Sequence, residues 1–196
     1  MPWTLNDALQ ECARNTYNTK VMIRGTTTGY QAKGLEYANR FLSGINYALS
    51  KIARERLGQY RTQEVTLNDK ARFSISALTG SVIRVNSVYS LDESVVFDIN
   101  VNETITVPGH ENSTVTVNYE VIPVQLTMGD LDTVLPIDER YIDPRVLCQY
   151  ANYQFLSESG TEYDSTRAQV WLGLFNDSFV NIMPTNRLPR KVRYTG

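Results

Sequence analysis

Apolar residues in the first third of the chain recur at helical spacing in two stretches. Thr4 is followed three residues later by Asp7, a pattern related to the capping box, and Leu5, Leu9 and Cys12 then repeat at intervals of three and four. This spacing predicts a first helix from about residue 4 to residue 15. A second, longer amphipathic helix is predicted by six apolar residues in one stripe: Leu35, Ala38, Leu42, Ile45, Leu49 and Ile52.

Between these helices, and again after the second one, the helical period is lost. The Thr-rich stretch from Asn15 to Gly29 is polar and contains two glycines, which predicts a long loop. After residue 63 come six short segments rich in Val, Ile and Thr and separated by Asp, Gly or Asn. Such segments are typical of antiparallel strands, so we predict a β lobe over residues 64–124.

The last third of the chain returns to helical spacing. Leu147, Ala151 and Phe155 predict one helix, and a second follows a turn at Ser159-Gly160, with apolar residues at positions 168, 172, 175, 179 and 182. This predicted hairpin is unusually rich in aromatic residues. Four of them follow the helical period, which indicates packing in the core or between subunits: Tyr150, Tyr153, Trp171 and Phe175.

The order of elements predicts an α+β fold, an α-helical bundle of about four helices with an inserted antiparallel β lobe. The bundle comprises residues 1–63 and 125–183, and the lobe comprises residues 64–124. Pro184 and Pro189 break helical structure, so residues 184–196 are expected to form an extended C-terminal arm.

Composition adds one feature to this picture, a local concentration of positive charge. The 196 residues are 42% hydrophobic and carry a net charge of -2, so no overall basic excess indicates a protein that wraps nucleic acid. The arm contains four basic residues and no acid, which leaves -6 on the rest of the chain. These residues are Arg187, Arg190, Lys191 and Arg193.

Residue types that carry enzyme chemistry are scarce. Cys12 and Cys148 lie in predicted helices outside any CxxC motif, which favours buried free thiols, and the single histidine, His110, lies in a predicted turn. The acids between Asp130 and Glu139 lack the spacing of an EF-hand, and we interpret them as a solvated connector. We therefore expect no catalytic activity, no cofactor and no bound metal.

No basic start followed by an apolar run opens the chain, and no segment approaches transmembrane length, so we expect a chain made in a cytosol with no membrane partner. Two other functions remain open at this point. A surface or carbohydrate-binding module would use the Tyr and Asn residues of the β lobe as its ligand face. A hydrolase would use paired carboxylates among the acids of residues 130–139.

Several stretches, taken in order, resemble the head-to-tail adaptor (connector, or head-completion) proteins of tailed bacteriophages. The stretches are TLNDALQECA, EYANRFLSGINYALSKIARERL, the end of the β lobe at VTVNYEVIPVQLT, and the C-terminal hairpin that begins at LPIDERYIDPRVLCQYANYQFL. They cover most of the chain. The β lobe is larger than that of the smallest adaptors and is similar to the one in adaptors with an inserted β domain.

The resemblance implies a structural virion protein in the neck, between the capsid portal and the tail. It implies a homo-oligomeric ring, usually of twelve subunits, that extends the DNA channel and provides the platform for tail attachment. The partners would be other copies of the chain, the portal protein, a downstream neck or tail protein, and genomic DNA that passes without sequence recognition. The arm would bind the portal through Arg187, Arg190, Lys191, Val192, Arg193 and Tyr194.

Overall fold

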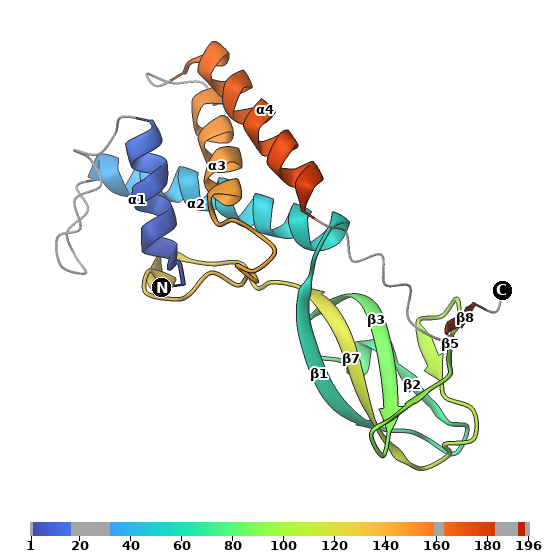
Figure 1. Ribbon diagram of the computed structural model, residues 1–196. Helices are drawn as coiled ribbons and strands as arrows, with labels where there is room; N and C mark the ends of the chain where they lie inside the picture. Colours follow the sequence, from blue (N-terminus) through green and yellow to red (C-terminus); the bar gives the residue numbers. More distant parts are fainter. Residues whose placement is uncertain (1, 17–31, 159–162, 183–191, 195–196) are drawn as a thin grey trace. The chain divides into compact units, whose positions relative to one another are not determined.

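The computed structural model describes residues 2–16, 32–158, 163–182 and 192–194. In these residues it confirms the predicted α+β fold, with four α-helices and a set of mostly antiparallel strands (Figure 1). The chain divides into two compact units. The helical unit comprises Met1–Arg56 and Val124–Met183, and the β unit comprises Leu57–Pro123 together with the C-terminal segment.

The predicted helices form with small changes. Helix α1 spans Leu5–Asn15 and begins at the expected capping box, in which the Thr4 hydroxyl accepts from the Asp7 backbone N–H and the Asp7 carboxylate accepts from the Thr4 N–H. Helix α2 spans Ala32–Glu55, and five of its six predicted stripe residues are buried. Leu35 is the exception, since 42% of its surface is exposed.

Helices α3 (Arg145–Ser157) and α4 (Ser165–Asn181) form the C-terminal pair. Helix α3 packs between α2 and α4 and also contacts α1. The crossing of α2 and α3 is close at Gly44, where an added Cβ atom would lie 2.6 Å from the Cα of Ala151. Of the loop predicted from Asn15 to Gly29, Asn15 belongs to α1 and Thr16 caps this helix, whereas residues 17–29 and the predicted turn at Ser159-Gly160 lie outside the described residues.

The connector between the β unit and α3 is fixed to the helical unit by hydrogen bonds. The backbone N–H of Leu5 donates to Thr133 O at 3.0 Å, and the N–H of Leu135 donates to Trp3 O at 2.9 Å. The side chain of Asn46, on α2, both donates to the carbonyl and accepts from the N–H of Leu126, each at 2.9 Å. These bonds satisfy polar backbone groups that regular secondary structure does not pair.

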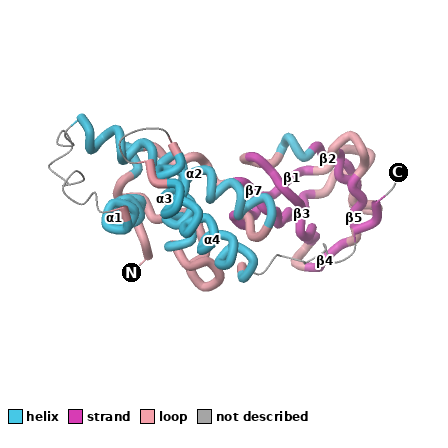
Figure 2. Tube along the Cα trace, turned by 90° about the horizontal axis from the view of Figure 1, so that it is seen from above, coloured by secondary structure: helices cyan, strands magenta, loops and turns pink. Residues whose placement is uncertain are grey.

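The β unit consists of two four-stranded sheets, whose strands are magenta in Figure 2. The first has the order β1-β7-β3-β4, with β1 at Gln59–Thr66, β3 at Ser81–Ser90, β4 at Glu93–Val95 and β7 at Thr114–Ile122. The second has the order β2-β6-β5-β8, with β2 at Arg72–Ser74, β5 at Phe97–Ile99, β6 at Thr104–Thr106 and β8 at Val192–Tyr194. Their shared core includes Val88, Phe97, Ile105, Val117 and Tyr119.

Two boundaries of the β unit differ from those predicted. The unit begins at Leu57 and not at residue 64, because the polar stretch QYRTQEVT forms β1. Only Val65 of this strand is buried, so the strand lacks the apolar alternation by which sequence reasoning finds strands. The second difference concerns the predicted arm, because its described residues, Val192–Tyr194, form β8 in the second sheet.

In the part of the chain that the structure describes, no helix combines the length and the apolar character that crossing a membrane would require.

Candidate interaction surface

Helix α4 is positioned by its cap and by one buried side. The Asp164 carboxylate accepts from the Arg167 N–H at 3.0 Å and so caps the first turn. Ala168, Phe175 and Phe179 are the buried residues of the helix, at spacings of seven and four, which places them on one side. This side faces α3, with which α4 makes its main contact (Figure 1).

An aromatic cluster joins α2, α3 and α4. The ring of Tyr150, on α3, stacks on Tyr47, on α2, with 4.6 Å between centroids and 13° between planes. Tyr150 also meets Phe175 edge-on at 5.0 Å, and Phe175 stacks on Phe179 at 5.5 Å. Burial, and then the neighbouring hydroxyl of Tyr47, raise the pKa of Tyr150 to about 12.

The four aromatic residues predicted to pack in the core or between subunits occupy different environments. Phe175 is fully buried in the helical unit, and its exposed fraction is 0%. Tyr150, Tyr153 and Trp171 are half-buried, and Tyr153 meets the Tyr150 ring edge-on at 5.5 Å. Tyr47, which completes this cluster, was not among the predicted residues because it lies outside the apolar stripe that predicted its helix.

The opposite side of α4 exposes a second apolar surface. Val170 is 59% exposed, Leu174 43% and Val180 65%. Gly173 lies among them, with no atom within 4 Å of the position that a Cβ would occupy. We call this surface, formed by Val170, Gly173, Leu174 and Val180, the outer face of α4.

A helix that carries apolar residues on both sides is normally covered on both sides. Leu174 is adjacent to the predicted apolar position 175, but neither Val170 nor Val180 is among the predicted positions. The signal that identifies them is the number of apolar residues in STRAQVWLGLFNDSFVN, which exceeds what one buried side needs. Exposed apolar residues one helical turn apart, as Val170 and Leu174 are, can mark an interaction site, so the outer face of α4, which also carries the exposed Asp177, is the candidate surface.

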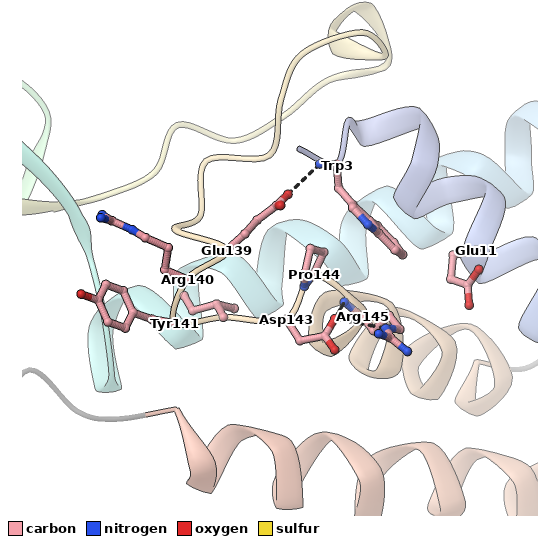
Figure 3. A pocket seen from close by; sticks show the side chains of 9 residues that line it. Trp3, Glu11, Glu139, Arg140, Tyr141, Asp143, Pro144 and Arg145 are labelled. Carbon is pink, nitrogen blue, oxygen red and sulfur yellow. Dashed lines mark hydrogen bonds and ion pairs between the residues drawn. The ribbon is translucent and has the colours of Figure 1, made fainter. Parts of the chain in front are cut away.

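A pocket of about 620 Å³ lies at the start of α3 (Figure 3). Its lining includes Trp3, Glu11, Glu139, Asp143 and Arg145. The charged groups already have partners within the chain: Glu139 accepts from the Trp3 N–H at 2.6 Å, and Arg145 pairs with Asp143 at 3.2 Å. Glu11 likewise pairs with Arg14 at 3.4 Å. A ligand in this pocket would therefore meet charged groups that already form hydrogen bonds or ion pairs within the chain.

The connector acids serve local structure. Asp130 caps a short 3-10 turn by accepting from Thr127, and these hydrogen bonds lower the pKa of its carboxyl. Asp138 forms an ion pair with Arg140 at 2.6 Å, and the hydrogen bond lowers the pKa of Asp138 as well. Among the described residues, no group of three or more His, Cys, Asp or Glu side chains could hold a metal ion.

The two cysteines are free and buried. Cys12, on α1, and Cys148, on α3, lie against each other, and the Cys148 thiol also donates to the Ala8 carbonyl at 3.5 Å. Burial, and then the contact with Cys148, raise the pKa of Cys12 well above its ordinary value, which keeps the thiol protonated and unreactive.

The predicted portal-binding residues are only partly described. Arg187, Arg190 and Lys191 lie outside the described residues. Val192, Arg193 and Tyr194 pair in parallel with β5 of the same chain, opposite Phe97, Asp98 and Ile99. The described end of the predicted arm therefore forms a strand on a sheet edge of its own chain, and its binding to a portal stays a prediction.

Comparison of the sequence with models of known protein families and with curated proteins gives no match of either kind.

Proposed function

We propose that the chain is a structural protein of a phage virion, a head-to-tail adaptor that forms a ring beneath the portal. The ring extends the DNA channel and provides the platform to which the tail attaches. The observation that carries the proposal is the outer face of α4, an apolar surface on a helix whose other side already packs in the helical unit. The proposal includes no catalytic activity and no cofactor.

A ring explains why a small helical unit exposes such a face. In a cyclic assembly each subunit uses two different surfaces, one for each neighbour, so apolar residues are needed laterally as well as in the core. Exposed side chains on α2, Leu35 at 42% and Tyr47 at 52%, belong to the same unit and give the outer face of α4 candidate partners on a neighbouring copy. Such a head-to-tail contact closes into a ring when the rotation between subunits permits it.

The size of the face suits assembly on a template. Helix α4 has 17 residues and is about 25 Å long at 1.5 Å per residue. One face of such a helix covers roughly 300 Å², well below the about 800 Å² that each partner of a stable pair buries. We therefore expect weak association in solution and ring formation on the portal, where neighbours are held together.

The charge distribution fits passage of DNA through the ring. The chain carries a net charge of -2, and its C-terminal thirteen residues carry four basic residues and no acid. A body without basic excess does not hold phosphates tightly, so DNA can move through the channel. The basic residues Arg187, Arg190 and Lys191 are then available for the portal.

The test is assembly of purified protein on the portal of the same phage. In the double variant Val170→Glu/Leu174→Glu we expect unchanged folding and loss of rings in electron micrographs, because two charges on an apolar contact oppose its burial. The matched control is Val101→Glu, on a valine of the β unit that is 84% exposed. Rings that form equally in all three proteins would contradict the role of the outer face, and a protein that never joins the portal would overturn the function itself.

A further inference from the structure

The edge of β5 is built to receive a particular strand. In the second sheet β5 pairs with β6 on one side, and β8 covers its other side in parallel. Without β8, the strand Phe97–Ile99 would be a sheet edge with unpaired backbone groups, which invites pairing with another chain.

The register of β8 matches the alternation of β5. Val192 lies opposite Phe97, a core residue of the β unit, and Tyr194 lies opposite Ile99, which is partly buried against that core. Arg193 lies opposite Asp98, so the apolar-basic-aromatic order of the tail follows the sequence alternation of β5. Successive residues of a strand face opposite sides of a sheet, so a shift of one residue would break this match.

The match includes charge. The Oδ1 atom of Asp98 is shielded from solvent and has no hydrogen-bond partner. Its neighbour across the strand on the β6 side is Thr106, a residue without charge, and its neighbour on the other side is the basic position 193. In this register an acidic residue of β5 stands opposite a basic residue of β8, and opposite charges at paired positions favour strand pairing.

We propose that the edge of β5 accepts the C-terminal strand of a second copy, so that neighbouring subunits exchange residues 192–194. Every copy carries the same edge and the same strand, and exchange therefore reproduces all contacts of β8 between chains. The ten peptide steps from Ile182 to Val192 span at most about 33 to 36 Å, so chain length alone does not confine residues 192–194 to the β5 edge of their own chain.

The small area of the outer face of α4 explains why neighbouring subunits would need the additional contact that an exchanged strand provides. That face covers less surface than a stable pair of subunits buries, and a second contact between the same neighbours adds to the buried area. The exchange rests on the proposed function in one respect, the association between copies of the chain. It requires neither the portal nor a role in a phage.

The experiment mixes two single-cysteine additions, Asp98→Cys in one chain and Arg193→Cys in the other. The purified proteins are mixed in equal amounts, concentrated, and treated with a short bismaleimide, which links two thiols without oxidation. We expect a covalent dimer at twice the chain mass of 22.3 kDa in the mixture, and none in wild type or in either variant alone. The double variant, when dilute, should give an intramolecular link.

Oligomers in native mass spectrometry without a covalent dimer in the mixture would overturn the exchange and leave the proposed ring intact. A chain that stays monomeric under all conditions, with portal included, would overturn both.

A second pair of variants covers the case in which a cysteine variant does not fold. Asp98→Arg and Arg193→Asp each place like charges across the strand pair, whereas a mixture of the two restores one opposite pair between chains. We expect the mixture to associate more tightly than either variant alone. Association of the mixture that equals the mean of the two variants would contradict the exchange.

Discussion

Leu174 and Phe175 are adjacent in α4 and have opposite surroundings. Phe175 is fully buried between Tyr150 and Phe179, whereas Leu174 is 43% exposed on the outer face. Because the two residues lie in the same helix, substituting each in turn distinguishes the contribution of the core to stability from the contribution of the surface to association.

Phe175→Ala should lower the free energy of unfolding by about 3–5 kcal/mol, since it leaves a cavity in the aromatic cluster. Leu174→Ala should change it by no more than about 0.5 kcal/mol and should instead weaken association between copies. Chemical denaturation and mass photometry measure the two effects. Equal losses of stability in both variants would show that Leu174 also belongs to the core.

Tyr150 makes stability depend on pH in the alkaline range. Its pKa is raised from 10.0 to about 12, so the folded chain holds this proton more tightly than the unfolded chain does. The stabilisation is complete below pH 10 and is lost as the pH rises towards 12. We expect Tyr150→Phe to reduce the slope of stability against pH in this window, measured as the difference between the two proteins in urea unfolding. A slope unchanged by the substitution would contradict the raised pKa.

At the scale of elements, two glycines show where helices meet and where they do not. An added Cβ at Gly44 would lie 2.6 Å from the backbone of α3, and at Gly173 it would meet nothing within 4 Å. The backbone of α3 cannot move aside as a flexible side chain can, so α2 and α3 depend on glycine at their crossing. Helix α4 has no such requirement within one chain.

Gly44→Ala should therefore destabilise the protein by about 1–3 kcal/mol through overpacking. Gly173→Ala should stabilise the isolated chain by about 0.5–1 kcal/mol, because alanine is the better helix former. Thermal unfolding of the dilute protein compares them directly. If Gly44→Ala unfolds at the wild-type temperature, the close crossing of α2 and α3 is wrong.

The helices could be predicted from sequence more fully than the strands. The capping box at Thr4 and the apolar stripe of α2 are local signals, and both correspond to observed structure. Strand β1 was missed in part because its side chains are mostly exposed, so its identity depends on pairing with β7. The pairing of residues 192–194 with β5 joins segments far apart in the chain, and no local pattern reports it.

The candidate surface was predicted less well for a related reason. Helical periodicity identifies the buried side of α4 through residues such as Phe175, but it treats additional apolar residues as extensions of that side. Only coordinates show that Val170 and Val180 lie away from the packed neighbours. The sequence reveals an excess of apolar residues and not the direction in which they face.

At the scale of the whole molecule, the two units have separate cores. Ile45 is fully buried in the helical unit, and Ile105 is fully buried in the core of the β unit. A chain built in this way need not unfold in a single step.

We expect calorimetry to resolve two transitions. Ile45→Ala and Ile105→Ala remove the same atoms, at a cost of about 2–5 kcal/mol each, and each should lower the temperature of only one transition. Limited proteolysis of the heated protein can assign the transitions, because the unit that melts first is cleaved first. Parallel shifts of both transitions in either variant would show that the units unfold together.

The pairing of β1 with β7 bears on how such a protein can evolve. Gln59 lies opposite Val121, so the chain enters and leaves the β unit at adjacent positions on neighbouring strands. A segment whose ends are adjacent can be gained, lost or exchanged as one block of coding sequence, because a short turn can replace it without displacing the flanking segments. Residues 57–123 can thus be replaced as one block without parting the flanking helices, but such a change also removes the strand with which Val192–Tyr194 pairs.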